Sequence, residues 1–308
     1  MTRTNLIIDN DFGGDPDGLF QLAHHLLSPS GNILGIVNSH VLPGDPNWPT
    51  NGNSIVKGLE DLEPISMLTD NRPKVFGGLV EGTIDHSKTV NDETLDFLVA
   101  ALESSSETLV YACGGPMTQL ARLVRAKPKN LDCLRVIWIG GSEYSGQYPP
   151  GASSMEYNFA ADPESVQIVF ENPDLEIWQV PRDSYRSAVV SSAELTRHLN
   201  SKGQLAQLLL ETIGEVKIRT LTNGIDIGET YCLGDSPLVL LSVLENSFEP
   251  SPAGSKFEEI VRRVVNSDGS YGPTLQIPRE KTRVFSELDT RLMFEDMFAK
   301  LGGSSGAL

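Results

Sequence analysis

The sequence has few cysteines and few basic residues, and each shortage excludes a class of protein. Only Cys113, Cys133 and Cys232 occur in 308 residues. They are widely spaced and odd in number, so we predict neither a disulfide framework nor a paired-cysteine metal site. Lysine and arginine number 24 against 41 aspartates and glutamates, which gives a net charge of −17. This balance argues against nucleic acids and anionic membranes as partners, because both bind basic surfaces.

Long apolar runs are also missing. No stretch of about 20 apolar residues is present, so no membrane-spanning helix is expected. The residues before Asp9 lack the apolar centre of a secretion signal. Together with the unpaired cysteines, these absences predict a protein of the reducing cytoplasm.

What is present is an alternation of strand-like apolar runs and segments with helical spacing. We expect strands at 5–8, 33–37, 108–112, 134–139 and 176–180, and helices at 19–27, 95–102, 117–124 and 164–170. This order is typical of βαβ units, so we predict an α/β fold with one open, mostly parallel sheet and helices on both faces. No shift in composition divides the chain. Residues 1–301 are therefore expected to form one domain, and the glycine- and serine-rich residues 302–308 a flexible tail.

Polar or glycine-rich segments follow three of these strands. Residues 9–17 follow the first, residues 114–118 follow 108–112, and residues 140–142 follow 134–139. Open parallel sheets bind ligands at the carboxyl ends of their strands. The three loops are therefore expected to meet at one crevice.

The first loop, DNDFGGDPDG at residues 9–18, holds four aspartates within nine residues. Helix capping explains part of this, because Asp15-Pro16-Asp17 combines an N-cap residue, a proline at the first helical position and an acid in the first turn. A cap does not need Asp11. Like charges this close raise each other's pKa unless a cation neutralises them, and a cluster of carboxylate oxygens suits Ca²⁺ or Mg²⁺.

Two other kinds of site, an EF-hand and a phosphatase active site, could also account for an aspartate-rich loop after a strand. An EF-hand is excluded because position 12, counted from Asp9, is Phe20 where the loop requires glutamate. A phosphatase with Asp9 as nucleophile and Asp11 as acid is a stronger rival, because an aspartate pair after an apolar strand is typical of such enzymes. The later lysine and acidic pair that it needs have no convincing counterpart.

Two later segments add oxygen and amide groups. Glu156 and Asn158 stand two residues apart, just before Asp162-Pro163-Glu164, which predicts a helix start. In an extended segment their side chains would point the same way and could grip adjacent hydroxyls of a sugar. Asp235 precedes Pro237, a pattern that helix capping also explains.

Together these segments resemble the inosine-uridine-preferring nucleoside hydrolase family. The resemblance lies in residues 9–18, Gly115-Pro116-Met117-Thr118-Gln119-Leu120-Ala121, Glu156-Tyr157-Asn158 before Asp162-Pro163-Glu164, and Gly234-Asp235-Ser236-Pro237, in family order. The chain departs from the family pattern in four places, one of which is that the family's Gly-Asn after the second strand has no clean counterpart, although Asn38, His40 and Gly52-Asn53 lie nearby. The other three are single residues. Pro16 separates two acids that the family has side by side, Gln119 replaces an asparagine, and Gly234 replaces a histidine.

The resemblance implies a Rossmann-like nucleoside hydrolase fold and Ca²⁺-dependent hydrolysis of a ribonucleoside to free base and ribose. It implies that Ca²⁺ is held by Asp11, by Asp15 or Asp17, by Asp235 and by the main-chain carbonyl of Thr118. Asp11 would take the proton of the attacking water.

The same resemblance implies the substrate contacts. Glu156, Asn158 and either Asp15 or Asp17 would hold the ribose hydroxyls. The partner would be a small nucleoside, and the assembly a homodimer or homotetramer. A catalytically degenerate nucleoside- or sugar-binding relative, or a hydrolase of another small glycoside, is the alternative.

With Gly234 in place of a histidine, another group must assist the leaving base. His86, beside Asp85, is one candidate for the general acid. Trp48, in the loop PGDPNWP at 43–49, is a candidate for stacking on the base. For either residue alone, an ordinary surface loop position is an equally simple explanation.

Overall fold

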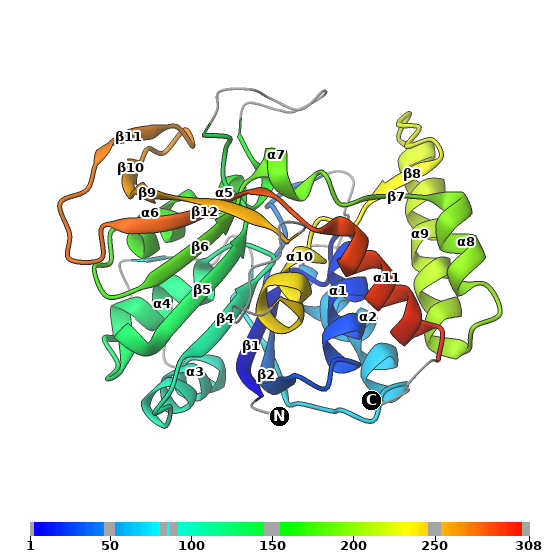
Figure 1. Cartoon of the computed structure of the whole chain (residues 1–308), viewed down its shortest axis with the longest axis horizontal. Coiled ribbons are helices and arrows are strands. Elements are labelled where there is room, and N and C mark those ends of the chain that lie inside the picture. The colour runs from blue at the N-terminus through cyan, green and yellow to red at the C-terminus, as the bar shows by residue number, and fades with distance from the viewer. Residues whose placement is uncertain are drawn as a thin grey trace.

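The computed structural model of the chain describes residues 3–45, 53–80, 85–86, 92–144, 155–245 and 254–303 (Figure 1). Its centre is a sheet of eight strands in the order β3-β2-β1-β4-β5-β6-β12-β9. The strands are β3 (Val75–Gly77), β2 (Gly31–Asn38), β1 (Thr4–Asn10), β4 (Leu109–Cys113), β5 (Leu134–Ile139), β6 (Glu176–Val180), β12 (Lys281–Glu287) and β9 (Lys256–Val261). All neighbours are parallel except β9, which runs antiparallel to β12. The predicted mostly parallel α/β fold is confirmed.

Helices cover both faces of this sheet, and β1 shows why the sequence forms it. Leu6 and Ile8 belong to one apolar core, which α1 (Asp17–Leu26) and α11 (Thr290–Leu301) also build. Ile7 belongs to the opposite core, with α3 (Glu93–Glu103), α4 (Thr118–Ala126) and α6 (Pro163–Phe170). A central parallel strand is buried on both faces, so its sequence is an unbroken apolar run instead of an alternating one.

Smaller elements surround the main sheet. α2 (Ser54–Met67) follows β2, and α8 (Ser192–Leu199) and α9 (Gln204–Thr222) lie side by side at one end of the molecule (Figure 1). Beside them, β7 (Val189–Ser191) pairs with β8 (Thr230–Cys232). At the other end, β10 (Arg263–Val265) pairs with β11 (Tyr271–Thr274). The short helices α5 (Tyr157–Ala161), α7 (Arg182–Tyr185) and α10 (Pro237–Val239), the last continued by a π-helical turn at Leu240–Leu244, lie in loops beside the sheet.

The strands predicted at 134–139 and 176–180 agree with β5 and β6, and the other predicted strands and helices lie within two residues of observed ones. Of the helices in the described part of the chain, none combines the length and the apolar character needed to cross a bilayer. Residues 302 and 303 form a turn, and 304–308 lie outside the described residues, so the flexible tail and the boundary at 301 stay predictions.

Candidate active site

A cavity of about 140 Å³ lies at the carboxyl ends of β1, β4 and β5. Its wall consists of Asp11, Asp15, Asp17, Gly114, Ile139, Glu156, Tyr157, Asn158, Tyr185, Gly234 and Asp235. The chain therefore brings together six of the predicted site residues, from the loops after β1 and β8 and from the segment that begins α5. Five of these six are carboxylates.

The carboxylates in this wall are crowded, and their surroundings oppose ionisation: Glu156 and Asp235 are buried, and Asp11, Asp15 and Asp17 are half-buried. Burial, followed by the charge of Asp235, holds the pKa of both Asp11 and Asp17 well above the usual range. Burial also raises the pKa of Asp235 to about 7 and that of Asp15 to about 6. Among the residues that the structure describes, no lysine or arginine makes an ion pair with Asp11, Asp17 or Asp235.

A bound divalent cation fits this donor set chemically. The side chains are all oxygen donors, which hard cations prefer, and they have negative charge to neutralise. Within the described ranges, however, no three acidic, thiol or imidazole side chains already stand in an arrangement that would hold a metal ion. The identity of the ion, and the exact ligands, therefore belong to the proposal below.

Asp9 differs from the other aspartates of its loop because it does not line the cavity. Its carboxylate accepts hydrogen bonds of 2.5 Å from the Ser39 hydroxyl and from the Tyr111 hydroxyl. Burial raises the pKa of Asp9 to about 7. A phosphatase nucleophile must face its substrate, so this enclosed position removes the support for the phosphatase interpretation.

The expectation that Glu156 and Asn158 lie in an extended segment was wrong. Glu156 is the N-cap of α5, and Asn158 lies inside that helix. The Glu156 carboxylate accepts hydrogen bonds from the amides of Gly141 (2.8 Å), Phe159 (3.0 Å) and Asn158 (3.2 Å), and from the Tyr185 hydroxyl (3.0 Å). Four donors occupy roughly all the acceptor sites of a carboxylate. A sugar hydroxyl could bond Glu156 only by displacing one of them, and Tyr185 is the one side chain among them.

Asn158 has one polar atom left for a ligand. Its Nδ2 group donates to the carbonyl oxygens of Gly114 (2.7 Å) and Ile139 (2.8 Å). Both N–H bonds are used, so the side-chain oxygen is the atom that can accept a hydrogen bond from a molecule in the cavity.

Tyr185 is a cavity residue that the sequence analysis missed. A Cβ atom added to Gly234 would lie 3.1 Å from Cδ2 of Tyr185 and 3.3 Å from an Asp17 oxygen, so the glycine leaves room for the tyrosine ring. Burial, and then the charge of Glu156, hold the pKa of Tyr185 well above its usual range, so its hydroxyl remains a donor. No motif marks Tyr185 in the sequence, because α7 is a single turn after β6.

Two of the predicted site residues that the structure describes, His86 and Thr118, do not line the cavity. His86 Nε2 lies 2.8 Å from an Asp162 oxygen, and the Thr118 hydroxyl donates to the same oxygen at 2.6 Å. Burial opposes ionisation of Asp162, but the hydrogen bonds from His86 and Thr118 outweigh it and lower the pKa of this carboxyl. Asp162 also caps α6, as predicted. The roles of His86 as acid and Thr118 as ligand stay predictions, and Trp48 lies outside the described residues.

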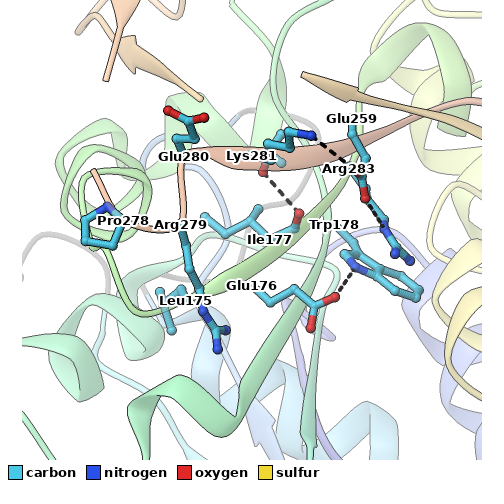
Figure 2. A pocket seen from close by; sticks show the side chains of 11 residues that line it. Leu175, Glu176, Ile177, Trp178, Glu259, Pro278, Arg279, Glu280, Lys281 and Arg283 are labelled. Carbon is cyan, nitrogen blue, oxygen red and sulfur yellow. Dashed lines mark hydrogen bonds and ion pairs between the residues drawn. The ribbon is translucent and has the colours of Figure 1, made fainter. Parts of the chain in front are cut away.

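A larger hollow of about 480 Å³ lies toward the amino ends of β6 and β12, at the opposite edge of the sheet. Figure 2 shows that two of its carboxylates are engaged by neighbouring side chains: Glu176 accepts from the Trp178 indole, and Glu259 pairs with Lys281 and Arg283. Trp178 also lies against the guanidinium of Arg283, 4.7 Å from its ring centroid. This hollow offers no convergent group for chemistry, so the smaller acidic cavity is the candidate site.

Known proteins share both the sequence pattern and the fold. Residues 6–294 match the family model described as inosine-uridine preferring nucleoside hydrolase. The pyrimidine-specific ribonucleoside hydrolase RihB of Escherichia coli O1:K1 / APEC is 24% identical over 295 residues, covering 89% of this chain and 88% of that protein. RihA of Enterobacter sp. (strain 638), also named pyrimidine-specific, is 31% identical over 104 residues, covering 33% of this chain and 32% of its own length.

Two solved structures show the same architecture. The purine-preferring ribonucleoside hydrolase from Gardnerella vaginalis superposes with a TM-score of 0.76 at 18% identity, covering 97% of this chain and 98% of that one. The plant nucleoside hydrolase PpNRh1 superposes with a TM-score of 0.71 at 17% identity, covering 97% and 99%. At sequence identities this low, the similarity to these two structures supports the fold alone.

The crowding of carboxylates generates a prediction about stability. Because the folded-state pKa values are raised, the metal-free folded protein binds protons that the unfolded chain releases, and its stability falls as pH rises from about 4 toward 7. In chelator at pH 7, Asp17→Asn should therefore raise the free energy of unfolding by about 1 kcal/mol or more. Urea denaturation measures this. The gain should vanish near pH 4, and the exposed control Asp174→Asn should show none; equal gains in both variants would contradict the interpretation.

Proposed function

The chain belongs to the inosine-uridine preferring nucleoside hydrolase family, and from this premise we propose that it hydrolyses the N-glycosidic bond of a ribonucleoside in the acidic cavity, with Ca²⁺ as cofactor. Its relatives are enzymes that act on such N-glycosyl bonds. The base is left open, because the named relatives include both pyrimidine-specific and purine-preferring enzymes.

One observation supports this proposal above the others: Asp11 is the carboxylate with the least compensation. No other described residue donates a hydrogen bond to its side-chain oxygens, whereas Asp15, Glu156 and Asp235 each accept at least one from a side chain. A carboxylate that is half-buried, uncompensated and open to a cavity is suited to take a proton. We assign Asp11 as the general base.

The remaining acids divide into two groups by their contacts. Asp17 is hydrogen-bonded to Asp235, so these two side chains, together with Asp11, are assigned as cation ligands. The Tyr231 hydroxyl donates to Asp15, which occupies one of its acceptor sites, and we assign Asp15 to the sugar. The main-chain carbonyl of Thr118 remains an additional ligand in this proposal.

The reaction follows from these assignments. Bound Ca²⁺ would supply positive charge that makes a neighbouring water easier to deprotonate. Asp11 accepts the proton of this water, whose oxygen forms a bond to the anomeric carbon as the bond to the base nitrogen breaks. The leaving base takes up a proton from solvent, and Asp11 afterwards releases the proton that it accepted to solvent. The ribosyl group passes through an oxocarbenium-like transition state, which the negative charges of Asp15 and Glu156 stabilise.

A homodimer or homotetramer is proposed on the resemblance alone, and a cytoplasmic location on the three widely spaced cysteines. A degenerate binder or a hydrolase of another glycoside is the alternative, favoured by the glycine at position 234. A hydrolase releases base and sugar, whereas a degenerate binder does not, and the next experiment measures this release.

The function is tested by the release of free base and reducing sugar from a panel of purine and pyrimidine ribonucleosides. Wild-type protein with Ca²⁺ should turn over at least one nucleoside, and chelator should abolish this. Asp11→Asn keeps the shape of the side chain but removes the base, and should lower kcat by a factor of about 10² or more. Binding of a nucleoside without release of sugar would show a degenerate binder, and turnover unchanged by chelator would exclude the metal.

The contact of Tyr185 with Glu156 gives a second prediction. A hydrogen bond to a charged group contributes about 1.5–3 kcal/mol to stability, so Tyr185→Phe should lower the free energy of unfolding by about this amount. Because Glu156 would also be held less firmly, kcat/KM should fall by about 10-fold or more. Tyr144→Phe is the matched control, because its hydroxyl binds Gln179 and lies outside the cavity wall. A Tyr185→Phe enzyme as active as the control would assign Tyr185 to packing alone.

A further inference from the structure

A circuit of buried polar side chains surrounds Asp235 without forming part of the cavity wall. Its members are Asn10, Gln21, His25 and Ser242, of which Ser242 is the most exposed at 8% and the other three are fully buried. They come from β1, from α1 and from the π-helical turn after α10. None was singled out as a functional residue from the sequence.

Asn10 joins two of the proposed cation ligands. Its Nδ2 donates to Asp235 Oδ2 at 2.9 Å and to Gln21 Oε1 at 3.2 Å. Its Oδ1 accepts from the main-chain amide of Asp11 at 2.9 Å. One amide group therefore fixes the main chain at Asp11 relative to a carboxylate 225 positions away in the sequence.

Two glycines make the space for this amide. A Cβ atom at Gly114 would lie 2.4 Å from Asn10 Nδ2, and one at Gly18 would lie 3.0 Å from it. The family has two adjacent acids in this loop; if the first is aligned with Asp17, the second falls at Gly18. The close approach of Asn10 is the physical reason that a side chain is absent there.

Only one assignment of donors and acceptors satisfies every hydrogen bond of the circuit. Ser242 donates its single proton to the carbonyl oxygen of Leu238 at 2.5 Å, so in its 2.9 Å contact with His25 the proton comes from His25 Nε2. His25 Nδ1 then accepts from the amide nitrogen of Gln21. Gln21 Oε1 in turn accepts from Asn10. Burial, followed by the charge of His24, lowers the pKa of His25 to about 3, so the ring is neutral as this order requires.

This order fixes which way the Asn10 amide points. If the amide were turned over, its oxygen would face the oxygens of both Asp235 and Gln21. Asp235 therefore always meets an N–H donor at Oδ2. Ser242 and Leu238 follow Asp235 in the same segment, so the circuit begins and ends on the element that carries this carboxylate.

We propose that Asn10 is a positioning residue for the cation site: the relay of Ser242, His25 and Gln21 orients its amide, and the amide holds Asp235 in place as a ligand. The inference rests on the cation site of the proposed function. Asn10 acts through Asp235 and through the Asp11 main chain. Residues that orient metal ligands typically contribute 10- to 100-fold to metal affinity.

Calorimetric titration of the metal-stripped full chain with Ca²⁺ tests this, using wild type, Asn10→Ala, Ser242→Ala and the double variant. Asn10→Ala should weaken Ca²⁺ affinity by about 10- to 100-fold and Ser242→Ala by a smaller factor. Because Ser242 acts only through Asn10, the double variant should bind Ca²⁺ as weakly as Asn10→Ala and no more weakly. In Asn10→Ala, kcat should recover at saturating Ca²⁺.

The matched control is Asn38→Ala. Asn38 is a fully buried amide at the end of β2 that donates to Ile55 O at 2.7 Å and contacts none of the cavity acids. Its removal should lower the melting temperature and leave Ca²⁺ affinity within about twofold, which separates positioning from general loss of stability.

Each of the other possible outcomes contradicts either the proposed cation site, the positioning role of Asn10 or the relay that orients it. If wild-type protein binds no Ca²⁺, both the proposed cation site and this inference fail. If it binds Ca²⁺ but Asn10→Ala binds equally well, or if the effects of Asn10→Ala and Ser242→Ala multiply in the double variant, the inference fails and the proposed hydrolysis stands. If Asn10→Ala does not fold, Ser242→Ala decides alone, and unchanged affinity there overturns the relay.

Discussion

The structure of this site depends on keeping five carboxylates together at one edge of the sheet, with Glu156 and Asp235 buried and the other three half-buried. Each buried carboxylate costs solvation energy and repels its neighbours, so each needs compensation. The protein supplies it unequally. Main-chain amides and Tyr185 compensate Glu156, Tyr231 compensates Asp15, and Asn10 compensates Asp235. Asp11 has the least compensation. These differences in compensation are the basis on which the five carboxylates are proposed to act as cation ligands, as sugar contacts or as the general base.

The compensation requires close approach, and glycines provide the room for it. The absence of a side chain at Gly114 admits the amide of Asn10, and its absence at Gly234 admits the ring of Tyr185. In both cases the donor touches a carboxylate of the cavity. The departure from the family pattern at Gly234 is thus matched by a tyrosine from another loop, so the space is filled without a histidine.

Much of the fold could be predicted because its central strands are buried on both faces. Leu6, Ile7 and Ile8 pack alternately into the two cores and therefore give a continuous apolar signal. The far edge of the sheet gave no such signal. Strand β9 is the antiparallel edge strand, with most of its residues exposed, and its sequence KFEEIV lacks a clear pattern. Its place, and that of β12 beside it, follows from tertiary pairing.

The sequence by itself determined the strands around β1, the loop of four aspartates, and the set of acids that meets at the cavity, because strand ends and local motifs are encoded by neighbouring residues. Only the tertiary structure decided what each group does. It enclosed Asp9 between Ser39 and Tyr111, placed Glu156 at a helix start, bound His86 to Asp162, and brought Tyr185 and Asn10 to carboxylates far away in the chain. Compensation of a buried charge depends on which donors come within about 3 Å of it, and donors this distant in sequence are selected only when the chain folds.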